Sequence, residues 1–125
     1  MTAAKVIDAS ALAAVTFVEP HMPDLTQRLN AEELFAPALL RFEMAHICIK
    51  KIRARPAERE AILAQHDASL AIPIREVPVD QAQIIELSDR LNLSAYDASY
   101  LWLAHKLGAE LITLDKQLEK AAAKI

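Results

Sequence analysis

Short apolar runs rich in β-branched residues alternate along this chain with longer stretches whose apolar residues recur at helical spacing. The strand-like runs are Lys5–Asp8, Leu34–Ala36, Ile72–Val77 and Leu111–Leu114. Strands that alternate with helices predict a parallel sheet with helices packed on both of its faces. The expected fold is therefore a three-layer α/β/α sandwich around a central, mainly parallel sheet. The 125 residues suffice for one such domain, 1–125, with a core that needs no disulfide or structural metal.

Two helices are well defined by the sequence. Residues 38–53 contain no Gly or Pro and place Leu40, Met44 and Ile52 on one stripe, so they predict a long helix. Ser94 and Asp97 have the spacing of a capping box with Asp in place of Glu, and Gly108 stands where a helix beginning at 95 would end. Pro73 weakens the third strand and favours a place near an edge of the sheet.

Composition excludes several classes of protein. The net charge of −3 argues against a chain that coats nucleic acid along its whole surface. The single cysteine, Cys48, has no partner for a disulfide or a zinc site, and it is interpreted as a small apolar filler. The uncharged stretch from Ala9 to Val18 is too short to span a bilayer. We therefore expect a cytoplasmic protein without a membrane segment.

Four acidic residues occupy positions that apolar surroundings make unusual. Asp8 ends the first strand and Asp115 follows the last one, so both are expected at the same edge of a parallel sheet. Asp97 heads a helical stripe that continues through apolar positions. Glu43 lies in the long helix, with apolar residues four positions before and after it. Each has a structural alternative, namely a helix cap or an ion pair, and the inference rests on the four together.

Carboxylates that are buried side by side repel one another, so they either become protonated or recruit a cation. Oxygen ligands suit Mg²⁺ or Mn²⁺, and no His or Cys arrangement supports zinc. The chemistry matched to a carboxylate-held magnesium ion is phosphoryl transfer. A phosphate-receiver domain is disfavoured, because no phospho-acceptor and lysine pair stands at the expected strand ends.

A local excess of positive charge falls in the middle of the chain. Between Arg41 and Arg59 there are six basic side chains against two acidic ones. Such a run is most often a solvated helix face. Beside an acidic site it could instead attract a polyanion, and Lys50, Lys51 and Arg53 are then the candidate contacts to that polyanion or to a protein partner.

The acidic residues also stand in motifs that can be compared with a known family. The segments are Val6-Ile7-Asp8-Ala9-Ser10, Leu40-Arg41-Phe42-Glu43-Met44-Ala45, Tyr96-Asp97-Ala98-Ser99-Tyr100-Leu101-Trp102-Leu103-Ala104 and Leu111-Ile112-Thr113-Leu114-Asp115. In order and spacing they resemble the motifs of PIN-domain proteins, and most closely those of VapC-type toxins of bacterial toxin–antitoxin systems. The resemblance runs from residue 5 to about residue 122.

The resemblance implies an Mg²⁺- or Mn²⁺-dependent endoribonuclease that is inhibited by a cognate VapB-like antitoxin, and a homodimer is expected. It implies that Asp8, Glu43, Asp97 and Asp115 form the catalytic and metal-binding site, with Ser10 and Thr113 as polar supports near the substrate. Asp8 and Asp97 are the expected direct ligands. Some family members carry a further polar or acidic residue where this chain has Leu118. The resemblance therefore does not determine whether the site holds one metal ion or two.

The alternative function is a PIN-like module that binds RNA or protein without catalysis. Other side chains carry weaker expectations. Tyr96, Tyr100 and Trp102 are interpreted as core or dimer-interface aromatics rather than platforms for bases. His46, one helical turn from Glu43, is expected on the surface, although it could touch substrate.

Overall fold

The chain is described by a computed structural model that covers residues 4–19, 22–29 and 33–124. Within these residues the strands are β1 (Ala4–Ile7), β2 (Glu33–Pro37), β3 (Ile74–Val77) and β4 (Glu110–Ile112). They form one sheet in the order β3-β2-β1-β4. Each neighbouring pair is parallel, and Val6 of β1 stands opposite Phe35 of β2 and Leu111 of β4. The predicted parallel sheet is confirmed.

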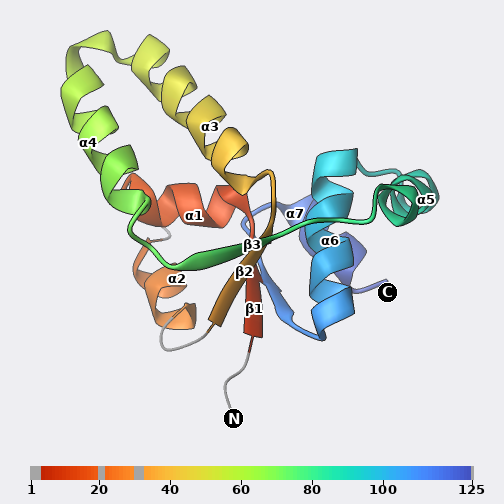
Figure 1. Ribbon diagram of the computed structural model, residues 1–125. Helices are drawn as coiled ribbons and strands as arrows, with labels where there is room; N and C mark the ends of the chain where they lie inside the picture. The colour runs from red at the N-terminus through yellow and green to blue at the C-terminus, as the bar shows by residue number, and fades with distance from the viewer. Residues whose placement is uncertain (1–3, 20–21, 30–32, 125) are drawn as a thin grey trace.

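Helices cover both faces of this sheet, which gives the predicted three layers (Figure 1). On one side lie α1 (Ala9–Thr16), α2 (Met22–Arg28), α3 (Leu40–Ala54) and α4 (Arg59–Ser69), with the short 3₁₀ turn η1 (Pro56–Glu58) between the last two. On the other side lie α5 (Gln81–Leu91), α6 (Ala95–Leu107) and α7 (Lys116–Ala122). The pair α3 and α4 forms a hairpin that projects beyond the sheet.

The core forms where the central strands meet α1 and α6. Val6 and Ile7 of β1 are fully buried, as a central parallel strand requires when helices cover both its faces. The small alanines of α1 are buried where this helix packs beside α2, α3 and α4, and α6, which packs on β1 and β2, is buried continuously from Ala98 to Ala104. Within the α3–α4 hairpin, Cys48 packs with Ile52 and Ile62, which agrees with its interpretation as a filler.

The strand order also fixes where a site can form. After β1 the chain builds β2 and β3 on one side, and it then returns to add β4 on the other side of β1. Open α/β sheets bind their ligands at such a reversal, outside the carboxyl ends of the strands. The reversal here lies between β1 and β4, whose carboxyl ends lead into Asp8 and Asp115.

The element bounds agree with the sequence best where caps define them. The Ser94 hydroxyl accepts a hydrogen bond from the Asp97 amide, and Gly108 ends α6 with a φ of 61°. The sequence predicts a buried last strand over Leu111–Leu114, and its bounds are wrong, because β4 begins at Glu110 and ends at Ile112, at the edge of the sheet. Within the predicted range Ile112 and Thr113 are buried, as expected. Thr113 lies just beyond the end of β4, and its hydroxyl donates a hydrogen bond to Asp8 in the site described below.

Candidate active site

Asp8 is the most constrained of the four acids. It is 5% exposed and directly follows β1, where it is the N-cap of α1. Its Oδ1 accepts hydrogen bonds from the Ser10 hydroxyl at 2.7 Å and from the Ala11 amide at 3.0 Å. Its Oδ2 accepts one from the Thr113 hydroxyl at 2.5 Å. Burial raises the pKa of this carboxyl, and the hydrogen bonds oppose that rise.

Ser10 and Thr113 connect the ends of β1 and β4. The Ser10 hydroxyl accepts from the Leu114 amide at 3.0 Å, and the Thr113 hydroxyl accepts from the Asp115 amide at 3.0 Å. The two hydroxyl oxygens are 3.4 Å apart. Because both hydroxyls also donate to Asp8, they hold its carboxylate in one orientation. The two hydroxyls thus contact Asp8 directly, while their role near a substrate stays a prediction.

Asp97 and Asp115 stand at the starts of two neighbouring helices. Asp97 lies in the first turn of α6, and Asp115 is the N-cap of α7, where its Oδ1 accepts from the Gln117 and Leu118 amides at 2.9 and 3.2 Å. Burial raises the pKa of Asp97, and the negative charge of Asp115 raises it further. The same charge also contributes to the raised pKa of Asp8. Asp115 therefore both caps α7 and belongs to the acidic group.

Glu43 reaches the group from the opposite layer of the fold. It lies in the first turn of α3, half-buried, and its Oε1 accepts a hydrogen bond of 2.5 Å from the Tyr100 hydroxyl of α6. Burial raises the pKa of Glu43, and the charges of Asp8 and Asp97 add to the rise, while the Tyr100 hydrogen bond opposes it. Burial also raises the pKa of Tyr100, so this phenol remains a donor.

The negative charges of Asp8, Asp97 and Asp115 each raise the pKa of another of the four acids, so the four lie within electrostatic reach of one another. Their use as one metal site stays a prediction. Among the described residues, however, no three His, Cys, Asp or Glu side chains are arranged so that they could hold a metal ion as they stand. An Mg²⁺ ion is commonly bound through one or two protein carboxylates, with water and phosphate oxygens completing its shell. The donor set fits that mode of binding, because it consists of carboxylate oxygens whose repulsion a cation would relieve.

The basic residues of α3 divide into two kinds. Lys51 is 3.1 Å from Glu19 and lies over the ring of Phe17, so its charge is already paired within the fold. Lys50 and Arg53 are exposed and are separated by three positions. With His46 they continue the helix stripe that begins at Glu43. The run therefore includes a positive stripe that leads from the acidic group along the projecting hairpin.

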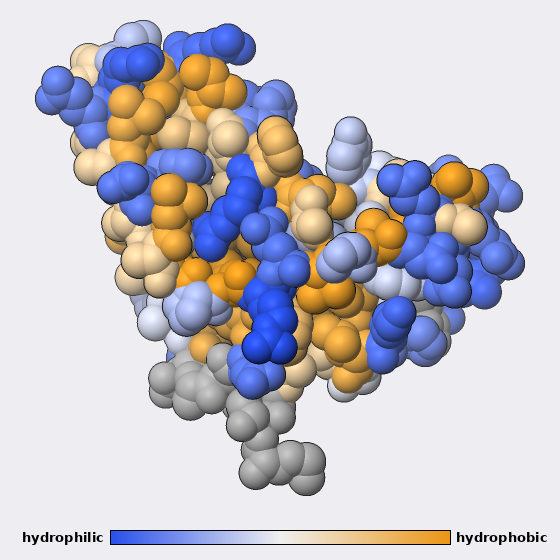
Figure 2. All heavy atoms as spheres, viewed as in Figure 1, coloured by the Kyte–Doolittle hydropathy of each residue, from blue (hydrophilic) through white to orange (hydrophobic). Residues whose placement is uncertain are grey.

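Two aromatic side chains flank the acidic group at the surface. Phe42, Glu43 and His46 of α3 line a hollow of about 400 Å³ together with Tyr96 of α6. Figure 2 shows the surface hollowed between the α3–α4 hairpin and the part that carries α5 and α6. Tyr96 is 62% exposed and is therefore not a core residue, whereas Tyr100 and Trp102 are buried. A place for Tyr96 at a dimer interface, the other half of the interpretation from the sequence, stays a prediction. His46 is on the surface, as expected.

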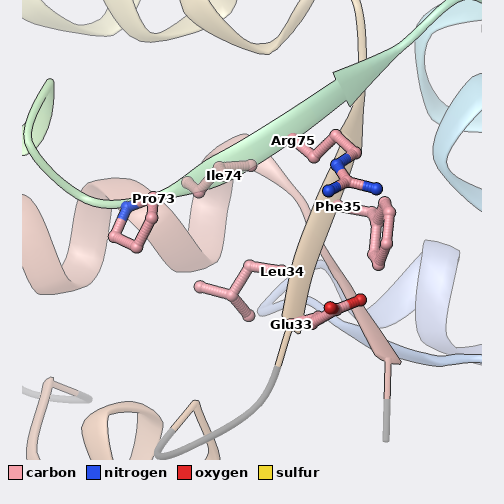
Figure 3. A pocket seen from close by; sticks show the side chains of 6 residues that line it. All are labelled: Glu33, Leu34, Phe35, Pro73, Ile74 and Arg75. Atoms are coloured by element: carbon pink, nitrogen blue, oxygen red, sulfur yellow. The ribbon is translucent and has the colours of Figure 1, made fainter. Parts of the chain in front are cut away.

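A second hollow, of about 470 Å³, lies on β2 and β3 away from the acids (Figure 3). It is lined by Glu33, Leu34, Phe35, Pro73, Ile74 and Arg75. The Arg75 guanidinium stands 5.6 Å from the centre of the Phe35 ring. None of the predicted site residues lines this hollow.

Sequence reasoning missed two residues of the site. Tyr100 follows Asp97 by three positions on a buried helix, and a buried phenol needs a hydrogen-bond partner, which was the available signal. Phe42 immediately precedes Glu43, on the face of α3 that carries His46 and Lys50. A large aromatic on an otherwise polar helix face is the signal that could have identified it.

The fold and the acidic site define a class of protein. The family model described as "PIN domain" matches residues 5–124, and the chain belongs to the PIN-domain family. It is 30% identical over 118 residues to ribonuclease VapC3 of Pyrobaculum aerophilum, covering 90% of each chain. It is 33% identical over 118 residues to ribonuclease VapC9 of Mycobacterium tuberculosis, covering 90% of this chain and 87% of the relative.

Two solved structures share the fold. The crystal structure of PAE2754 from Pyrobaculum aerophilum superposes with a TM-score of 0.77 at 24% identity, covering 97% of this chain and 86% of that one. That of VapC20 from Mycobacterium tuberculosis, a toxin that cleaves the sarcin–ricin loop, gives a TM-score of 0.66 at 15% identity, covering 94% of each. Among the described residues, no helix is long and apolar enough to cross a membrane.

Proposed function

We propose that this chain is a divalent-metal-dependent endoribonuclease, the toxin component of a VapBC-type toxin–antitoxin pair. The observation that carries the proposal is the coupling of Asp8, Glu43, Asp97 and Asp115 at the reversal of strand order, where α/β sheets bind ligands. Relatives that match 90% of the chain are named ribonucleases, which supports RNA as the substrate.

Asp8 and Asp97 are proposed to bind Mg²⁺ or Mn²⁺ directly. When bound, such an ion lowers the pKa of water and offsets the charge that develops on the phosphate and on the leaving oxygen. Glu43 and Asp115 would contact the metal ion through bound water, or they would orient the water that attacks the phosphate. Ser10 and Thr113 fix Asp8 at an orientation in which both of its oxygens are hydrogen-bonded. Tyr100 orients Glu43 through a single hydrogen bond to Oε1.

The exposed stripe of α3 is proposed to bind the RNA backbone. Lys50 and Arg53 point away from the core of the hairpin, so they are available to phosphates. An acidic site on a chain of net charge −3 repels RNA unless positive charge lies near it, and these residues supply that charge. Lys51, which pairs with Glu19, contributes less.

Partners follow from the same proposal. A VapB-like antitoxin would inhibit the enzyme, and the protein would act in the cytoplasm as a homodimer. The gene next to this one tests the toxin assignment, because a small neighbouring gene for a DNA-binding protein with a C-terminal tail is expected. Co-expression of the two proteins should yield a complex without nuclease activity.

The deciding experiment measures cleavage of total RNA by the purified protein. Cleavage is expected with Mg²⁺ or Mn²⁺ and should stop in EDTA, because the acids alone provide no positive charge for the phosphate. Restoring activity with excess Mg²⁺ controls for damage by the chelator. Undiminished cleavage in EDTA contradicts the metal-dependent mechanism, and an absence of cleavage with either metal favours a module that only binds.

A further inference from the structure

Two large aromatic side chains are exposed next to the acids. Phe42 is 83% exposed and Tyr96 is 62% exposed. Each immediately precedes an acid of the site, Glu43 in α3 and Asp97 in α6. Apolar side chains that a folded chain leaves this exposed do not contribute their burial to its stability, and when they cluster they mark a binding surface.

These aromatics come from opposite layers of the fold and line one hollow. The hollow of about 400 Å³ is bounded by Phe42, Glu43, His46 and Tyr96. Glu43 belongs both to this hollow and to the acidic group, where Asp8 and Asp97 act on its charge. A molecule in the hollow therefore lies against the acidic group.

We propose that Phe42 and Tyr96 form a stacking subsite for an unpaired nucleobase beside the phosphate that the acidic site cleaves. This inference rests on the proposed ribonuclease function and names how its substrate is held. Single-stranded RNA is bound through bases stacked on aromatic side chains and through hydrogen bonds to base edges. The rings supply the stacking surface, and the Glu43 carboxylate and the His46 imidazole lie in the same hollow to supply the hydrogen bonds.

The polar groups in the hollow favour a base over an apolar occupant. An apolar side chain from a second copy or a protein partner would cover the Glu43 carboxylate, whose one hydrogen bond, from the Tyr100 hydroxyl, leaves its charge only partly compensated, and burying such a charge is costly. A nucleobase presents both an aromatic face and donor groups at its edge. The exposed Lys50, on the same stripe of α3, then stands where the backbone of the bound strand carries its negative charge.

The test removes the aromatic rings of Phe42 and Tyr96 from the protein, one at a time, and removes single bases from the RNA. The variants are Phe42→Ala and Tyr96→Ala, with Phe42→Tyr and Tyr96→Phe keeping a ring. Ile85→Ala removes an apolar side chain that is 65% exposed on α5, outside the hollow, and is the matched control. The probe is a single-stranded RNA oligonucleotide that spans the bond cut in total RNA, with the natural base or an abasic ribose on each side of that bond.

Single-turnover cleavage in Mg²⁺ at increasing enzyme concentration separates binding from chemistry. Each alanine variant should raise the half-saturating concentration for the natural RNA about 5- to 150-fold, the range that base–aromatic stacking corresponds to. The maximal rate should stay within about 2-fold, because the ring stacks on the base before and during the reaction alike. On the correctly placed abasic RNA the alanine variants should equal the wild type, and the ring-keeping variants should bind the natural RNA nearly as the wild type does.

Other outcomes overturn the inference. Equal half-saturating concentrations for the wild type and both alanine variants contradict stacking and leave the nuclease proposal intact. An equal loss on natural and abasic RNA assigns the rings to the fold or, if sedimentation shows that a dimer has become a monomer, to contact with a second copy. A wild-type protein that cleaves no RNA contradicts both this inference and the proposed function.

Discussion

Asp8 has two structural roles that a single substitution can separate. Its Oδ1 caps α1 through the Ala11 amide, while its charge belongs to the acidic group. An asparagine at this position keeps an oxygen for the cap and removes the charge. We therefore expect Asp8→Asn to fold and to lose more than about 100-fold in RNA cleavage, because even the residues that only orient metal ligands contribute 10- to 100-fold.

The same loss is expected for Asp97→Asn. Asp89→Asn, which changes an exposed acid on α5, is the matched control for the loss of one negative charge. Circular dichroism checks the fold of each variant, and the cleavage rate in Mg²⁺ checks its activity. Near-full activity of Asp8→Asn or Asp97→Asn would remove that residue from the catalytic site.

Tyr100 carries a prediction of a different kind, because it acts through Glu43. Tyr100→Phe keeps the buried ring and removes the donor that lies 2.5 Å from Glu43 Oε1. A hydrogen bond to a charged acceptor stabilises a fold by roughly 1.5–3 kcal/mol, and Glu43 is only half-buried, so we expect a loss of about 1 kcal/mol. Cleavage should fall about 10-fold as Glu43 loses its orientation.

Urea unfolding and single-turnover rates measure the two effects of Tyr100→Phe. Trp102→Phe is the control, because it changes a neighbouring buried aromatic whose indole N–H donates to Gln83 outside the acidic group. Unchanged cleavage by Tyr100→Phe would show that the hydrogen bond serves the fold alone.

At the scale of single residues, the sequence predicts that the four acids lie near one another and only partly predicts which side chains contact them. Asp8 and Asp115 closely follow strands that the β-branched runs predict, so their common edge was predictable even though β4 ends two residues earlier than expected. The hydrogen bond from Tyr100 to Glu43 was not predictable, because it joins two helices, α6 and α3, from opposite layers of the fold. Their relative placement depends on packing that no local pattern encodes.

The long helix α3 shows what an element adds to the properties of its residues. Its buried stripe, with Leu40, Met44, Cys48 and Ile52, holds it in the fold. Its opposite face runs from Phe42 and Glu43 at the site to Arg53 near the hairpin tip, where hydrophilic side chains are prominent in Figure 2. The sequence predicted the buried stripe, but only the structure separates Lys51 from its basic neighbours by pairing it with Glu19.

This separation makes a testable difference between lysines. Replacing Lys50 and Arg53 together by Gln should weaken RNA binding and reduce its dependence on salt. For single strands the logarithmic slope falls by roughly 0.7 for each phosphate that the protein no longer neutralises. Lys51→Gln should leave the slope unchanged and lower stability instead, because it breaks the ion pair with Glu19 and removes the cation from the Phe17 ring.

Fluorescence anisotropy of a labelled single-stranded RNA at several salt concentrations measures the slope. The comparison of the double variant with Lys51→Gln controls for loss of positive charge from the same helix. An unchanged slope in the double variant would assign Lys50 and Arg53 to a solvated face or to a protein partner. A reduced slope in Lys51→Gln would show that its ion pair opens when RNA binds.

Elements differ in how well the sequence defines them. α6 was predictable to within a residue, because Ser94 and Gly108 provide explicit start and stop signals. β4 was not, because Leu111–Leu114 is apolar except for one threonine and the strand ends where Thr113 leaves the ladder to bond Asp8. A tertiary contact decides that boundary.

On the scale of the whole molecule, the fold brings together acids that the unfolded chain keeps apart. The pKa values of Asp8, Glu43 and Asp97 are raised from ordinary values of 3.8, 4.5 and 3.8, in each case with burial as the largest cause. A raised folded pKa means that the folded state binds protons more tightly than the unfolded state. The stabilisation from these groups is therefore complete below the ordinary values and is lost as the pH rises through the raised ones.

The metal-free protein should consequently be less stable at pH 7 than at about pH 5, as far as these three carboxyls contribute. At pH 7 in EDTA, Asp8→Asn should melt above the wild type by a few degrees, because it removes the carboxylate that is most deeply buried. Its remaining oxygen can still accept from the Ser10 hydroxyl and the Ala11 amide. Leu118, at the start of α7, is fully buried and untouched by the change.

Adding Mg²⁺ should reverse the order of the two melting temperatures. An ion that binds only the folded state stabilises it by RT ln(1 + [L]/Kd), and Asp8→Asn has lost a proposed ligand. Melting curves at pH 5 and pH 7, first in EDTA and then with Mg²⁺, measure the whole cycle, with Asp89→Asn as the charge-matched control. If the wild type melts above Asp8→Asn in EDTA and gains nothing from Mg²⁺, the acids do not share a cation, and metal-dependent cleavage loses its physical basis in this fold.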